Sequence, residues 1–176
     1  MPPENFDAVA IAGVMTATLR DFGQRDMALL HGGVYEATLA HRVAVYLESR
    51  LSGWHVDCEY NRNLGYTKMR SDAANGMRPD IIAHVRNTPN NLLFVEIKKT
   101  SHSAAKKNEA RDRVRDVTSL WTNYPRYAHG VVLTFPVSGS RRDTVICEWY
   151  HRNATYGGAP ITSVVNVQLT PPPTPT

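Results

Sequence analysis

Asp80, Glu96 and Lys98 are the residues of this chain best suited to chemistry on a charged substrate. Asp80 precedes an apolar, β-branched run, and Glu96 and Lys98 lie near the end of a second such run. A short polar break containing Pro89 separates the two runs, a pattern that predicts two strands joined by a hairpin. Because a hairpin brings its outer ends together, we expect Asp80 and Glu96 to be neighbours at one end of a sheet.

The three side chains would meet only if they share a face of that sheet. Facing alternates along a strand, so Glu96 and Lys98 point the same way. Asp80 points the same way if the residue numbers of each pair across the hairpin add up to an even number. The sequence does not fix this register. Two carboxylates gathered there repel each other unless something binds them. Mg²⁺ accepts such oxygen ligands and activates water against a phosphodiester, with Lys98 orienting that water or offsetting charge on the phosphate. The alternative is a group of solvated strand-end charges without a metal.

The order Pro79-Asp80 followed by Glu96-Ile97-Lys98 resembles the motif of the PD-(D/E)XK nuclease superfamily, which has the restriction-endonuclease-like fold. The resemblance implies that Asp80 and Glu96 are metal ligands and that the Ile97 carbonyl is a further ligand. It implies Lys98 as the catalytic lysine and Mg²⁺ or Mn²⁺ as the cofactor.

The composition is that of an ordinary globular protein. The chain has 176 residues, of which 42% are apolar and 20% charged, and its net charge is +4, which suits an anionic partner. We expect a single domain over 1–169, with its core at about 34–136, and a disordered or extended Pro- and Thr-rich tail over 170–176. Cys58 and Cys147 are too far apart in sequence for a zinc motif and are expected to be reduced core residues. No leader or membrane-length apolar run is visible, which favours a cytoplasmic protein.

Hydrophobic periodicity predicts an α/β fold with a central mixed sheet flanked by helices. The predicted helices cover 6–22 (ending near Gly23), 34–51 and 104–121, and the predicted strands cover 54–62, the two arms of the hairpin, 129–135, 144–150 and 164–169. The order helix, strand, strand, strand, helix, strand is the αβββαβ core that the resemblance implies.

A third acid, Glu36, lies on the apolar stripe of the helix predicted over 34–51, the stripe that should face the sheet. In the nuclease superfamily that the motif resembles, an acid from the corresponding helix often lies beside the metal, and Glu36 matches that position. The alternative is a helix-start carboxylate favoured by the helix dipole. Without metal, crowding of these acids should raise at least one carboxyl pKa. Asp57 and Glu59, on the strand before the hairpin, either face solvent, as we expect, or compete for a place in the acid cluster.

Basic residues surround the motif in sequence and predict contacts with a phosphate backbone, although a solvated surface would carry the same charges. By resemblance, the helix after the Glu-x-Lys strand often lends a basic residue to the site, and Arg111 or Arg115 could do so without either matching cleanly. The predicted nucleic-acid contacts are Lys68, Arg70, Arg78, Lys99, Lys106 and Lys107.

Taken together, these residues favour a Mg²⁺- or Mn²⁺-dependent nuclease. DNA is the expected substrate by resemblance, although no residue separates DNA from RNA. One alternative is a nucleic-acid-binding module without turnover, and another is a metal-independent scaffold that binds a protein. The length of the chain suggests a homodimer or a protein partner for sequence-specific cutting.

Overall fold

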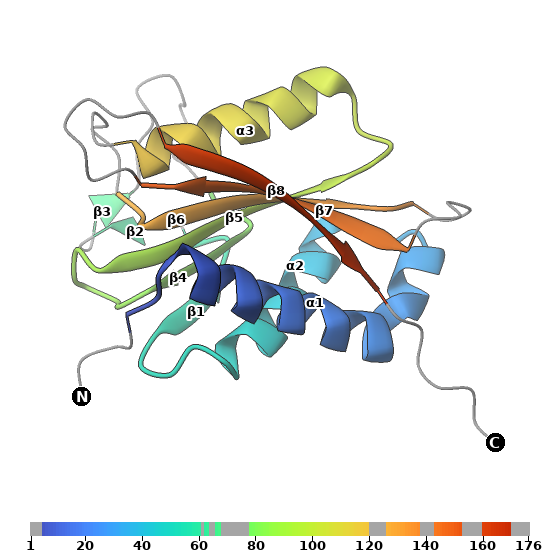
Figure 1. Cartoon of the computed structure of the whole chain (residues 1–176), viewed down its shortest axis with the longest axis horizontal. Helices are drawn as coiled ribbons and strands as arrows, with labels where there is room; N and C mark the ends of the chain where they lie inside the picture. The colour runs from blue at the N-terminus through green and yellow to red at the C-terminus, as the bar shows by residue number, and fades with distance from the viewer. Residues whose placement is uncertain are drawn as a thin grey trace.

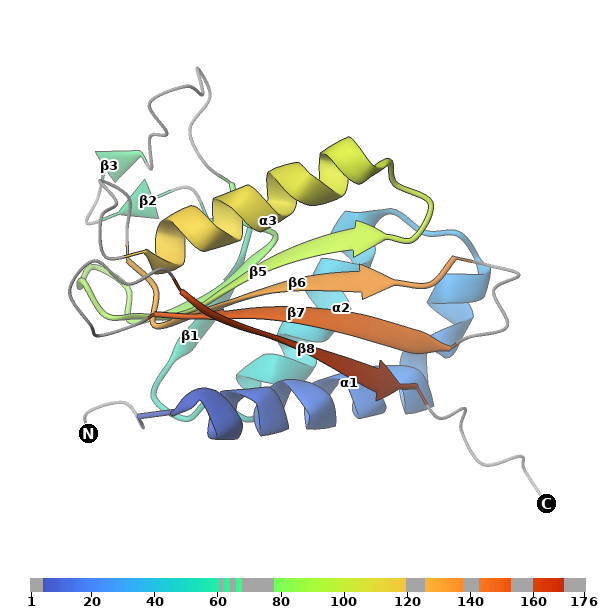
Figure 2. The same ribbon diagram turned by 45° about the horizontal axis from the view of Figure 1, so that its top comes forward.

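A single mixed sheet carries all the elements that position the motif. The computed structural model describes residues 5–60, 78–119, 126–137, 143–152 and 160–169, with the backbone of 62–63 and 66–67. Helices α1 and α2 pack on one face of the sheet and α3 lies across the other (Figures 1 and 2). The elements are α1 (Ala8–His31), α2 (Glu36–Glu48), β1 (His55–Cys58), β2 (Arg62–Asn63), β3 (Tyr66–Thr67), β4 (Ile81–His84), β5 (Asn91–Lys99), α3 (Ala104–Thr118), β6 (His129–Phe135), β7 (Thr144–His151) and β8 (Ile161–Gln168).

The strand order in the sheet is β1-β4-β5-β6-β7-β8, and β2 pairs with β3 in a separate short ribbon. Among the strands that the structure describes, β5 and β6 are the one parallel pair, and α3 makes the crossover between them, as a parallel pair requires. Every residue of β6 is buried, which explains its near-continuous apolar sequence. The predicted α/β class with a mixed sheet flanked by helices is confirmed, and α2, β1, β4, β5, α3 and β6 follow the expected order.

The register of the hairpin answers the question that the sequence left open. Ile81 of β4 pairs with Val95 of β5, and Ile82 pairs with Phe94, so paired numbers have an even sum at the end of the hairpin next to Asp80, before the register shifts at His84. Extended by one residue, this register sets Asp80 opposite Glu96. Since Phe94 packs in the core beneath α3, Asp80, Glu96 and Lys98 leave the backbone on the α3 side of the sheet.

Two expectations about individual elements were wrong. Helix α1 does not end near Gly23 but continues to His31. A Cβ atom on Gly23 would lie 3.0 Å from Cβ of Leu169, so this glycine allows close packing against the end of β8 rather than ending the helix. Cys58 is exposed, because β1 ends there at the edge of the sheet, whereas Cys147 is buried as expected. The tail predicted over 170–176 lies outside the described residues.

Two hydrophobic cores hold the layers together. The larger lies between the sheet and helices α1 and α2. The smaller lies under α3 and includes Phe94, Val114 and Tyr127. A Cβ on Gly130 would come within 2.5 Å of Cγ1 of Val114, so the glycine of β6 lets α3 approach the sheet closely. None of the helices in the described ranges combines the length and apolarity needed to cross a membrane.

Candidate functional site

Four charged side chains from three segments meet at one end of the sheet. Nζ of Lys98, on β5, lies 3.5 Å from Oε2 of Glu96, 3.7 Å from Oε2 of Glu36 and 3.8 Å from Oδ2 of Asp80. The same ammonium donates to the Ile97 carbonyl at 2.6 Å. The structure therefore brings together all the residues that the motif singled out, including Glu36 at the start of α2.

Asp80 is held by the strand opposite it. Its Oδ2 accepts a hydrogen bond from the Ile97 amide at 2.5 Å, which fixes the carboxylate at the point where β4 begins. Burial raises the pKa of Asp80, while the Ile97 amide and the charges of Lys98 and Arg113 act in the opposite direction. A partly buried carboxylate with one fixed oxygen is a well-oriented ligand for a cation.

Glu96 is the most deeply buried acid of the group, with a side chain only 2% exposed. Its Oε2 accepts a hydrogen bond from Arg113 at 2.8 Å. Burial, and secondly the charge of Asp80, raises the pKa of Glu96 to about 7, against the lowering effect of Arg113 and Lys98. The expectation of a raised carboxyl pKa is confirmed, although burial contributes more than crowding. At neutral pH the metal-free site is therefore poised between two protonation states.

The donor atoms suit a hard divalent cation in their chemistry. Oε1 of Glu96 is buried and has no hydrogen-bond partner among the described residues, and the buried Oε1 of Glu36 has only the nearby imidazole of His102. Carboxylate and carbonyl oxygens are the ligands that Mg²⁺ and Mn²⁺ take. Within the described ranges, however, no three His, Cys, Asp or Glu side chains stand in a metal-binding arrangement as they are. The Lys98 ammonium lies among these oxygens, so a cation could be bound there only if that ammonium moved away.

A cleft of about 270 Å³ opens beside the carboxylates. Its lining includes Glu36, Cys58, Glu59 and Asp80. Glu59 is exposed, as expected, but borders this cleft, and its φ of 49° is in the left-handed region. Asp57 is outside the cluster, since its carboxylate binds Arg86 and His84. Asp57 is therefore no competitor for the site, whereas Glu59 is close to it.

The basic residue that α3 contributes is Arg113, which sequence reasoning missed. Arg111 instead binds Glu148 of β7, with two contacts of 2.9 Å, and Arg115 binds Asp112 on the exposed side of α3. Helical periodicity contained the signal, because Arg113 lies on the same stripe as the buried residues Ala110, Val114 and Val117.

His102 is a second residue that sequence reasoning missed. It lies in the turn between β5 and α3, next to Ser103, the N-cap of α3. Its Nδ1 lies 3.2 Å from Oε1 of Glu36. No local pattern points to this contact, because it depends on how α2 packs beside the end of β5.

The predicted nucleic-acid contacts other than Lys99 fall into three groups. Lys68 and Arg70 lie outside the described residues, and Arg78 and Lys106 are exposed. Lys107 is partly exposed, and its ammonium donates to the Thr100 carbonyl at 2.8 Å. Of the four predicted contacts that the structure describes, Arg78 and Lys106 present a side chain open to a phosphate without first breaking a contact that the structure shows.

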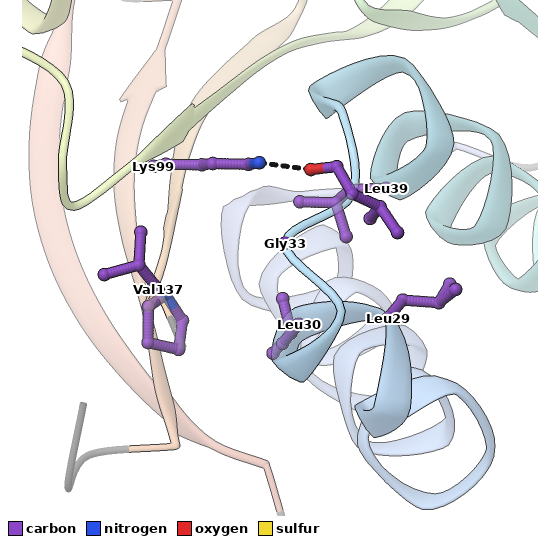
Figure 3. A pocket seen from close by; sticks show the side chains of 8 residues that line it. Leu29, Leu30, Gly33, Leu39, Lys99 and Val137 are labelled. Carbon is purple, nitrogen blue, oxygen red and sulfur yellow. Dashed lines mark hydrogen bonds between the residues drawn. The ribbon is translucent and has the colours of Figure 1, made fainter. Parts of the chain in front are cut away.

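Lys99 differs most from expectation. Its ammonium donates to the Val34 carbonyl across a small apolar pocket lined by Leu29, Leu30, Leu39 and Val137 (Figure 3). This pocket, of about 30 Å³, has room for roughly one water molecule. Lys99 therefore ties β5 to the start of α2, next to Glu36, rather than facing a groove for a nucleic acid.

Comparison of the chain with protein-family models, with characterised proteins and with solved structures finds no match. The resemblance to the PD-(D/E)XK superfamily therefore depends on the motif residues, their order along the chain and their geometry.

Proposed function

We propose that this chain is a divalent-metal-dependent nuclease that hydrolyses phosphodiester bonds, with DNA as its substrate. One observation carries the proposal: Glu36 of α2, Asp80 just before β4 and Glu96 of β5 all lie within 4 Å of the Lys98 ammonium. Burying three carboxylates together is unfavourable unless positive charge compensates them, and a bound divalent cation would supply that charge.

In this proposal Asp80, Glu96 and the Ile97 carbonyl hold Mg²⁺ or Mn²⁺, and Glu36 adds an oxygen. When bound, such a cation supplies a Lewis acid that polarises the phosphate and lowers the pKa of water. Arg113 holds the Glu96 carboxylate in place through its 2.8 Å hydrogen bond, and the Ile97 amide does the same for Asp80. The two principal ligands are thus oriented before any substrate arrives.

In this proposal Lys98 orients the attacking water. Hydrolysis forms a bond between the water oxygen and phosphorus, breaks the bond to the leaving oxygen, and transfers a proton from the water to the leaving group by way of solvent. Once released from the Ile97 carbonyl, the ammonium would lie beside Asp80 and Glu96, where it can hold the water and offset the negative charge that grows on the phosphate.

A specific observation also favours the second candidate, a binding module without turnover. The Lys98 ammonium already neutralises part of the carboxylate charge and donates to the Ile97 carbonyl, so the cluster has a counter-charge of its own. Such a protein would bind nucleic acid through Arg78 and Lys106 without needing a metal.

Cleavage assays separate the two candidates. The purified chain would be incubated with supercoiled plasmid, single-stranded DNA and RNA in Mg²⁺, Mn²⁺ or EDTA. We expect metal-dependent cleavage that falls by at least about a hundredfold in Asp80→Ala and in Lys98→Ala. Glu48→Gln, at the exposed far end of α2, is the control and should retain activity. Binding without cleavage, or equal cleavage by wild type and Lys98→Ala, would favour the binding module instead.

A further inference from the structure

Two buried ligand atoms face each other beside the predicted metal site. Nδ1 of His102 and Oε1 of Glu36 lie 3.2 Å apart. Each is buried, and among the described residues this contact, an ion pair when the imidazole is protonated, is the one polar contact shown for either atom. The second oxygen of Glu36, Oε2, points instead toward the Lys98 ammonium at 3.7 Å. The Glu36 carboxylate therefore stands between the Lys98 cluster on one side and the imidazole on the other.

The separation of these two atoms suits a shared metal ion. Imidazole nitrogen and carboxylate oxygen bind transition metals at about 2.0–2.2 Å. Two ligands at that distance and at right angles to each other are about 3 Å apart. When Nδ1 carries no proton, the lone pairs of the two atoms face each other unfavourably, and an ion bound by both would compensate them at this separation.

The turn that carries His102 is fixed by several hydrogen bonds. The His102 amide donates to the Lys99 carbonyl at 3.0 Å, and the Ser103 hydroxyl caps α3 by accepting from the Lys106 amide. Thr100 Oγ1 accepts from the Val137 amide at 3.2 Å. The His102 side chain remains 25% exposed, as does that of Glu36. The pair is therefore held in place by the turn, with its two ligand atoms buried and the rest of each side chain partly open to solvent.

We propose that His102 is a further metal ligand, which together with Glu36 makes the site prefer a transition-metal ion such as Mn²⁺ over Mg²⁺. The inference rests on the proposed function, because Glu36 would belong to the same metal centre. Mg²⁺ strongly favours oxygen ligands, whereas first-row transition metals accept imidazole readily. Asp80, Glu96 and the Ile97 carbonyl offer oxygen alone, so His102 is the residue that would give this centre its selectivity.

Titration calorimetry with Mn²⁺ and with Mg²⁺ tests the proposal on the full chain. We expect His102→Gln to weaken Mn²⁺ binding at least about tenfold and to change Mg²⁺ binding less than about twofold. His41→Gln is the matched control, since His41 is an exposed histidine on α2. Equal losses for both metals would overturn the proposal, because His102 would then organise the site rather than select the ion.

Electron spin-echo spectroscopy of bound Mn²⁺ gives a readout that does not depend on how well a variant folds. Wild-type protein should show nitrogen modulation from a directly coordinated imidazole, and its absence would overturn the role of His102. If Glu96→Gln abolishes Mn²⁺ binding while His102→Gln leaves it unchanged, the nuclease centre stands and the His102 inference fails. If wild type binds neither metal, both fail.

Discussion

Replacing Glu96 by glutamine should stabilise the metal-free protein at neutral and alkaline pH. The carboxyl of Glu96 has an ordinary pKa of 4.5 and a pKa of about 7 in the folded chain, chiefly because it is buried. Between these two values the folded state holds a proton that the unfolded state has lost. The free energy of unfolding therefore decreases as the pH rises from 4.5 to about 7, and it changes no further above that.

The size of the effect follows from the same two values. One pH unit corresponds to about 1.4 kcal/mol, so the ionised Glu96 costs up to about 3 kcal/mol of stability at pH values above the folded-state pKa. Glutamine has nearly the shape of the protonated acid and cannot ionise. Glu96→Gln should match the wild type near pH 4.5 and exceed its free energy of unfolding by up to about 3 kcal/mol near pH 8.

Urea denaturation in EDTA, followed at both pH values, measures this difference directly. Glu109→Gln is the control, because Glu109 contacts the same Arg113 from a side chain that is 60% exposed. It should change stability by less than about 0.5 kcal/mol at either pH. Adding Mg²⁺ at pH 8 should stabilise the wild type and leave Glu96→Gln unchanged. The reasoning is refuted if Glu96→Gln is the less stable protein at pH 8, or if the difference is the same at both pH values.

Three further predictions concern other parts of the chain. Gly130→Ala should destabilise the fold by about 1–3 kcal/mol in urea denaturation, because the added Cβ would lie 2.5 Å from Cγ1 of Val114. An unchanged stability would mean that α3 does not pack this closely on β6. A thiol reagent should modify exposed Cys58 and spare buried Cys147, which mass spectrometry of the labelled peptides would check. Because Cys58 lines the cleft, a bulky adduct on it should block cleavage in the plasmid assay. His129 and His151 contact each other through their Nδ1 atoms at 2.9 Å, and burial lowers the pKa of each below 6.5. In a Glu96→Gln background, which removes the titration of Glu96, the free energy of unfolding should therefore fall as the pH drops from about 7 to about 5. Adding His151→Gln should make this fall smaller. An equal dependence of stability on pH with and without His151→Gln would contradict the prediction.

Local patterns were sufficient to predict most of the fold. β6 was predicted with its observed limits because a fully buried strand has an uninterrupted apolar sequence. The order of elements around the hairpin followed from periodicity, and the even register that sets Asp80 opposite Glu96 was one of only two possibilities. The end of α1 was misplaced because Gly23 was taken for a helix stop, whereas its role is to contact Leu169.

The remaining features of the site depend on how distant elements pack. Glu36 could be proposed from the apolar stripe of α2, but its contact with His102 links the first turn of that helix to a turn far along the chain. Arg113 was obscured by the many other charges of α3, of which Arg111 is engaged by β7 and Arg115 by its own helix. Lys99 was predicted to contact phosphate, but its ammonium donates a hydrogen bond to the Val34 carbonyl.

Anomalous diffraction from crystals grown with Mn²⁺ tests the central claim most directly. If Glu36, Asp80, Glu96 and Lys98 form a nuclease centre, an anomalous peak should lie between the Asp80 and Glu96 carboxylates and the Ile97 carbonyl, with the Lys98 ammonium displaced from that carbonyl. A site without such a peak, with Lys98 still donating to Ile97 at saturating Mn²⁺, would contradict the proposal.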